Sequence, residues 1–70
     1  MRFKVYGEVK DYAGYIAIIK CDEYEVEKGK YKECMIHCFD NEKGINDTPI
    51  RKYIGAIICD SYKVEETIWL

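Results

Sequence analysis

Five residues of the types that bind metals or act as nucleophiles are spread along the chain: Cys21, Cys34, His37, Cys38 and Cys59. Tetrahedral zinc needs four such ligands converging on one point at about 2.3 Å. In an extended segment, Cys34 and Cys38 would lie about 13 Å apart, at roughly 3.3 Å per residue. Only a helical or bulged segment would let Cys34, His37 and Cys38 share a metal, and the paired Cys-x-x-Cys spacing of zinc sites is missing. We therefore expect small buried thiols and no cofactor, with a zinc-stabilised mini-domain as an alternative.

Catalysis by a thiolate would have to use His37 as its base, because the chain has no other histidine. On a strand, His37 and its neighbour Cys38 point to opposite faces, so local geometry separates them. Acidic residues are common, yet no pair of them lies in an apolar context that would shift its pKa. No glycine-rich phosphate loop is present either. The sequence predicts a protein that is not an enzyme.

A basic and aromatic row lies near the N-terminus, where Arg2, Lys4, Tyr6 and Lys10 share the polar side of an alternating segment. Small β-barrels bind single-stranded nucleic acid in this way, because bases stack on rings while cations follow the phosphates. A solvated sheet face would have the same composition, and the net charge of −2 favours that interpretation. Nucleic-acid binding is therefore an alternative hypothesis.

An acidic row follows, in which Glu23, Glu25 and Glu27 recur at every second position. On a strand these carboxylates point the same way, about 6.6 Å apart. Such a row would fit a basic cleft meant for nucleic acid, as small nuclease inhibitors do. It would also serve as a charged edge that blocks unwanted strand pairing.

The chain has more large apolar and aromatic side chains than so small a core can bury. Candidates for an interface with another protein are Tyr6, Tyr12, Tyr31, Trp69 and Leu70, together with the acidic row. Tyrosine and tryptophan are enriched where interfaces concentrate their binding energy. A final strand that packs its own side chains is an equally good interpretation of the Ile-Trp-Leu end.

The element that organises all these residues is a stretch used twice. Residues 15–27 read YIAIIKCDEYEVE and residues 53–65 read YIGAIICDSYKVE, which agree at 8 of 13 positions with an offset of 38 residues. A repeat at a fixed offset identifies the structural unit. If both copies share one conformation, the isoleucine-rich first halves favour strands.

Strands are predicted near 2–10, 15–27, 31–39, 50–59 and 62–69, with 15–27 either one long bent strand or two short ones. Residues 2–10 alternate between apolar and polar side chains, which is typical of a half-buried strand. Turns are predicted at 11–14 and 28–30, and a long polar loop at 40–49. The segment after Thr48-Pro49 also has helical spacing, so a helix near 49–59 in an α+β fold is the alternative.

These elements predict one all-β domain over residues 1–70, as a five-stranded antiparallel meander or a small barrel resembling SH3-like or OB-type architecture, with an internal duplication. There is no signal-peptide pattern and no apolar run of roughly 18–20 residues. We expect a cytoplasmic, non-enzymatic protein-binding module that does not contact membranes and forms a homodimer or a larger complex. One concrete form is a small inhibitor of a host defence complex or nuclease, encoded by a mobile element.

Overall fold

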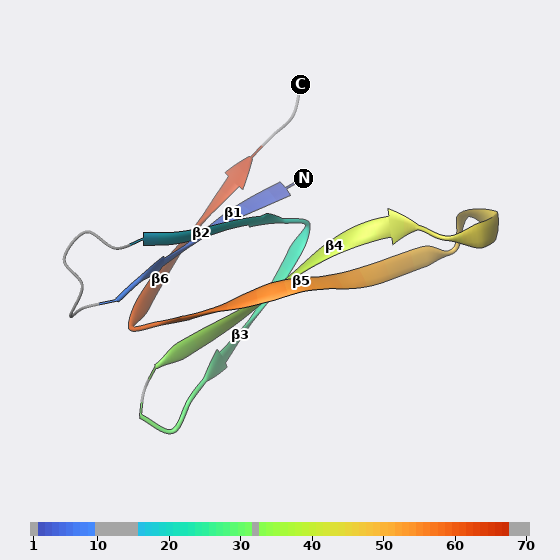
Figure 1. The fold of residues 1–70 in the computed structure, drawn as a ribbon. Helices are drawn as coiled ribbons and strands as arrows, with labels where there is room; N and C mark the ends of the chain where they lie inside the picture. The colour runs from blue at the N-terminus through green and yellow to red at the C-terminus, as the bar shows by residue number, and fades with distance from the viewer. Residues whose placement is uncertain (1, 10–15, 32, 68–70) are drawn as a thin grey trace.

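A computed structural model describes residues 2–9, 16–31 and 33–67, and this part of the chain is almost entirely β-strand (Figure 1). The strands are β1 (Arg2–Glu8), β2 (Ile16–Cys21), β3 (Glu23–Lys28), β4 (Cys34–Lys43), β5 (Pro49–Cys59) and β6 (Ser61–Thr67), with one short 3-10 turn at Ile45–Asp47. The predicted all-β class is confirmed. The segment that also had helical spacing, near 49–59, is a strand, because its isoleucines fit a sheet better than a helix. No helix in the described ranges is long and apolar enough to cross a membrane.

Two three-stranded antiparallel sheets form the body, rather than one five-stranded meander or a closed barrel. Sheet A has the order β2-β1-β6 and sheet B the order β3-β4-β5. The sixth strand arises because the predicted segment 15–27 is divided by a bend at Asp22 into β2 and β3. β6 returns to β1 instead of extending the meander beyond β5.

Both copies of the repeat change sheets at their Cys-Asp step. β2 lies in sheet A and continues through Asp22 into β3 of sheet B, while β5 lies in sheet B and continues through Asp60 into β6 of sheet A. At each bend the aspartate N–H donates to a carbonyl on the central strand of the sheet being entered. Asp22 bonds Phe39 on β4 at 2.9 Å, and Asp60 bonds Glu8 on β1 at 2.9 Å.

The register of the two sheets repeats as well. In sheet A, Ile19 of β2 faces Val5 of β1, and in sheet B its counterpart Ile57 faces Ile36 of β4. β1 and β4 are therefore equivalent central strands. The repeat seen in the sequence has a structural counterpart, a half-unit of three consecutive strands. Strands β1–β3 form the first half-unit and β4–β6 the second. In each half-unit the first two strands form the hairpin of one sheet, and the third strand joins the other sheet.

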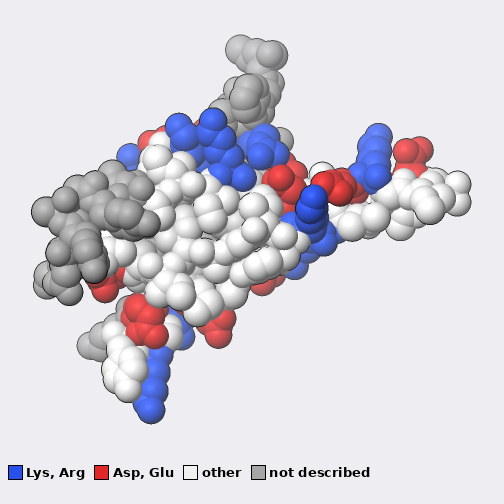
Figure 2. All heavy atoms as spheres, viewed as in Figure 1, with Lys and Arg blue, Asp and Glu red and all other residues white. Residues whose placement is uncertain are grey.

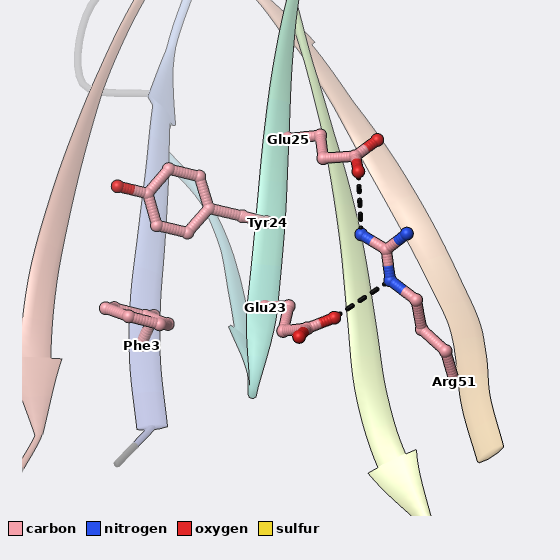
Figure 3. Close-up of a pocket in the computed structure, with 5 residues that line it drawn as sticks. All are labelled: Phe3, Glu23, Tyr24, Glu25 and Arg51. Atoms are coloured by element: carbon pink, nitrogen blue, oxygen red, sulfur yellow. Dashed lines mark hydrogen bonds and ion pairs between the residues drawn. The ribbon is translucent and has the colours of Figure 1, made fainter. Parts of the chain in front are cut away.

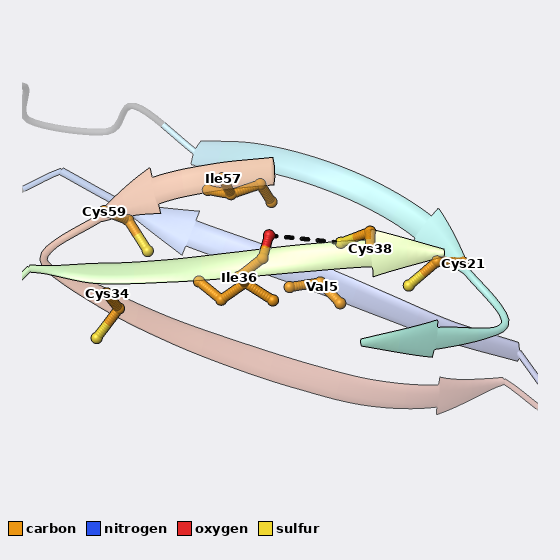
Figure 4. Close-up of a cluster of buried hydrophobic side chains, with 7 residues drawn as sticks. All are labelled: Val5, Cys21, Cys34, Ile36, Cys38, Ile57 and Cys59. Carbon is orange, nitrogen blue, oxygen red and sulfur yellow. Dashed lines mark hydrogen bonds between the residues drawn. The ribbon is translucent and has the colours of Figure 1, made fainter. Parts of the chain in front are cut away.

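The core lies between the inner faces of the two sheets and is small (Figure 4). Its buried members are Val5, Cys21, Cys34, Ile36, Cys38, Ile57 and Cys59. All four cysteines are thus free thiols inside the core, as expected for small apolar residues. Burial, with a further contribution from Cys21, raises the pKa of Cys38 to about 12.

A two-stranded arm projects from this body (Figure 1). β3 stops pairing with β4 at Phe39, and beyond that residue β4 and β5 pair only with each other, from Asp40–Lys52 to Lys43–Pro49. The predicted loop at 40–49 was therefore wrong over much of its length, because only residues 44–48 turn. The arm has no buried side, so it lacks the alternation by which strands are recognised.

The remaining strand predictions differ at their ends. The hairpin turn predicted at 28–30 is confirmed but longer, since the Gly29 N–H donates to the carbonyl of Glu33 at 2.8 Å. β4 therefore starts at Cys34 and not at Tyr31. β1 ends at Glu8 and β6 spans Ser61–Thr67. The turn predicted at 11–14 falls outside the described residues.

Candidate functional site: the outer face of sheet B

The outer face of sheet B changes from acidic to apolar across its three strands. Side chains that lie directly opposite one another in neighbouring strands point to the same face of a sheet. Register therefore assigns this face to Glu23, Glu25 and Glu27 on β3, to Met35, His37 and Phe39 on β4, and to Tyr53, Ala56 and Ile58 on β5. The three glutamates of the acidic row therefore share one face of β3, which is an edge strand.

Arg51 reaches back across this face from the arm. Its guanidinium lies over the ring of Phe39, 3.6 Å from the centroid, and forms ion pairs of 2.8 Å with both Glu23 and Glu25 (Figure 3). The hydrogen bond to Glu25 is the main cause of the raised pKa of Arg51. Three partners thus fix a long side chain that would otherwise be mobile.

His37 connects the centre of the face to both of its sides. Its Nδ1 lies 3.1 Å from the hydroxyl of Tyr53, and its Nε2 lies 3.1 Å from a carboxylate oxygen of Glu27. The Tyr53 ring meets Phe39 edge-on, with centroids 5.4 Å apart. Side chains from β3, β4 and β5 therefore form one connected network on the surface.

An open depression of about 510 Å³ borders the same face. It is lined by Phe3, Tyr24, Glu23, Glu25 and Arg51 (Figure 3). Tyr24 points toward Phe3 and meets it edge-on, with ring centroids 5.2 Å apart. The depression is shallow and combines aromatic walls with paired charges, which suits the contact of a protein side chain.

The outer face of sheet A is richer in cations than that of sheet B, because it carries Lys4, Lys20 and Lys63 beside Glu8 and Glu65. Lys4 and Lys63 both lie near Tyr6, with their Nζ atoms 5.8 and 5.7 Å from the ring centroid, and Lys20 faces Lys4 from β2. The Tyr6 hydroxyl donates to Glu65 at 3.0 Å. Lys63, and then Tyr6, lower the pKa of the Glu65 carboxyl.

The predicted basic row is only partly assembled. Arg2 does not join the lysines, because its guanidinium bonds Asp22 at 3.0 Å and Asp40 at 3.4 Å beside the bend between β2 and β3. Lys10 lies outside the described residues. Lys20 and Lys63, from the neighbouring strands β2 and β6, lie beside Lys4 and Tyr6 instead. The alternation within residues 2–10 could not predict them, because they come from other strands.

The alternative of a zinc site at Cys34, His37 and Cys38 meets a geometric obstacle, as does catalysis by a thiolate with His37 as its base. Cys34 and Cys38 are buried on the inner face of β4, whereas His37 belongs to the outer face. Among the described residues, no group of three or more His, Cys, Asp and Glu side chains is placed to hold a metal ion.

The other interface candidates are dispersed. Tyr31 is 82% exposed in the turn between β3 and β4. Tyr12, Trp69 and Leu70 lie outside the described residues. Sequence reasoning missed Arg51, Phe39, Tyr53 and His37 as a cluster. Pairing 31–39 with 50–59 as a hairpin would have suggested it, but the register depends on a bulge between Cys38 and Phe39.

No protein-family model, curated protein or solved structure matched the chain.

Proposed function

We propose that the protein is a non-enzymatic binding module that docks on another protein through the outer face of sheet B. The observation that carries this proposal is the fixation of Arg51 against Phe39 by Glu23 and Glu25 on an exposed surface. Arginine and tyrosine are enriched among the residues that dominate binding energy. A side chain that is already ordered loses less entropy on binding.

The arrangement of the face supports the same proposal. Tyr53 and Ile58 are 54% and 61% exposed on the β5 side, and Glu25 and Glu27 remain 60% and 68% exposed on the β3 side. Apolar groups bordered by charge are typical of protein interfaces. The complementary partner would present an apolar patch opposite β5 and cationic side chains opposite β3.

Absence of catalysis is supported by where the reactive groups lie. The His37 ring is engaged by Tyr53 and Glu27, and the thiols are buried on the other side of the sheet. A small inhibitor of a host defence complex or nuclease, encoded by a mobile element, remains the concrete form of the proposal. Such targets carry basic clefts that the carboxylates of β3 would fit, although Arg51 already neutralises part of the row.

Affinity capture from the native cell tests the proposal when it is run with matched variants. Arg51→Ala combined with Tyr53→Ala should abolish capture of a partner that the wild-type protein retains. Lys20→Ala combined with Lys63→Ala, on the opposite sheet, should leave capture unchanged. Equal capture by both double variants would mean that the outer face of sheet B is not the docking surface.

A second candidate function, single-stranded nucleic-acid binding, is favoured by the three lysines on the outer face of sheet A, two of which lie within 5.8 Å of the Tyr6 ring centroid. Fluorescence anisotropy with an oligothymidylate probe would test it. Binding by this face should weaken steeply between roughly 50 and 200 mM salt and be lost on replacing Lys20 and Lys63. No binding at low salt would exclude it.

A further inference from the structure

The free edge of β5 is the most unusual surface feature of the described chain. β5 is an 11-residue strand, Pro49–Cys59, and among the described strands only β4 pairs with it. Long exposed edges are templates for pairing with another chain, so proteins usually shorten them or guard them with charges. This edge is long, and its exposed side chains include Ile50, Tyr53, Ile54 and Ile58.

The two cations on this strand do not guard its edge. Arg51 is drawn back over its own sheet by Glu23 and Glu25, and Lys52 pairs with Glu42 of β4 at 3.4 Å. Both charges therefore point toward the neighbouring strands. In Figure 2 the surface over the part of β5 that lies on the body is uncharged, and charged groups lie along the arm.

The total surface of the chain is larger than that of a compact monomer by about the area of one interface. A compact monomer of 8.3 kDa exposes about 4,600 Å², by the usual scaling of surface with mass. This chain exposes 5619 Å², roughly 1,000 Å² more. A standard protein interface buries about 800 Å² on each partner, so the excess is of the size that one interface removes.

The arm supports pairing along the same edge. Four rungs of β4 and β5, from Asp40–Lys52 to Lys43–Pro49, extend beyond the last residue that β3 pairs with. A two-stranded ribbon is only marginally stable in water, whereas additional strands stabilise it. A strand added beside β5 would convert the arm into part of a wider sheet.

We propose that the partner is a second copy of this chain, which pairs with β5 along its free edge between Ile50 and Ala56 to join the two B sheets into one. Identical edges meet around a two-fold axis, so one self-complementary apolar strand is sufficient for both subunits. The resulting six-stranded sheet carries apolar β5 side chains at its centre and the carboxylate rows of β3 along both margins. Two copies of the proposed docking face then lie side by side.

Sedimentation equilibrium of the purified protein tests this inference. The wild-type protein should have twice its monomer mass of 8.3 kDa at micromolar to sub-millimolar concentration. Ile54→Lys should raise the dimer dissociation constant by about 100-fold, because the symmetric interface would bring in two charges. Ile54 is unpaired at the bulge and 43% exposed, so this change should leave the fold intact.

The control is Ile18→Lys, the same substitution on β2, which is the edge strand of sheet A, at a residue that is 51% exposed. It should not change the mass. Hydrogen exchange supplies a second measurement, since those β5 amides between Ile50 and Ala56 that point away from β4 should lose protection on dilution, whereas those bonded to β4 should keep it. A monomeric wild-type protein at sub-millimolar concentration, or a dimer that survives Ile54→Lys, would overturn the proposal. Because neither experiment involves another protein, its failure is distinct from failure of the proposed docking function.

Discussion

At Gly7 of β1 the backbone lies against side chains of β5 from the other sheet, so replacing this glycine with alanine should test how the two sheets pack. A methyl group at Gly7 would overlap Cγ2 of Ile57 and lie 3.2 Å from both Cβ and Sγ of Cys59. These atoms belong to the core and are not free to move away. Overpacking of this kind costs about 1–3 kcal/mol. A chain of this length has a total stability of only roughly 4–10 kcal/mol, so the loss should be easily measured.

Gly55, on β5 of sheet B, is a glycine where an added methyl group should be tolerated. A methyl group there would meet no atom within 4 Å, and the other copy of the repeat carries Ala17 at the matching position. Gly55→Ala should raise the unfolding free energy by about 0.4–1 kcal/mol, since it restricts the unfolded chain without a clash. Urea titrations followed by circular dichroism would give both free energies.

A second substitution identifies the atom responsible. In the Gly7→Ala background, Ile57→Leu removes the γ-methyl group that would clash, whereas Ile57→Val keeps it. Leucine should therefore recover part of the lost stability and valine should not. The packing of β5 onto β1 would be refuted if Gly7→Ala proved neutral, or if valine rescued as well as leucine.

Two further predictions concern charge. The pKa of Cys38 is about 12 in the folded chain against 9.0 for an ordinary thiol, so the folded protein keeps a proton that the unfolded chain loses above pH 9. The contribution of this thiol to stability should therefore be constant below about pH 9 and be lost as the pH rises toward 12. Cys38→Ala should make the alkaline slope in urea titrations shallower, and the raised pKa values of Cys21 and Cys59 should account for the slope that remains. Arg2→Ala should cost about 1–2 kcal/mol, because it leaves Asp22 and Asp40 facing one another half-buried beside the bend, and the loss should shrink in high salt. Equal losses at low and high salt would mean that Arg2 acts by packing instead of charge.

Alternation gave the reliable part of the sequence prediction. In β1 and in the first half of β4, one face is buried and the other is wet, so Val5 and Ile36 mark the inner side wherever the strands pair. The repeat allowed a second inference, that residues 50–59 are extended despite their helical spacing. The matching segment that begins at residue 15 had been predicted to be a strand, and the structure confirms that residues 50–59 form one.

What could not be predicted depends on long-range pairing. Asp22 bends the chain from one sheet to the other because its backbone finds Phe39, a residue 17 positions away, and nothing local identifies that partner. Arg51 was overlooked because its ion pairs with Glu23 and Glu25 require β3 and β5 to lie on either side of β4. The single bulge next to Phe39 decides which β5 side chains share the outer face.

The two sheets keep one internal arrangement while their outer faces differ in charge. Tyr6 on β1 and His37 on β4 occupy equivalent positions, and each bonds the matching glutamate of an edge strand, Glu65 at 3.0 Å and Glu27 at 3.1 Å. Between these shared contacts, Lys63 stands on β6 where Glu25 stands on β3. Exposed positions contribute little to stability, so they can differ without disturbing the half-unit that builds the core. A repeated scaffold thereby presents a lysine-rich face on sheet A and an acidic and apolar face on sheet B.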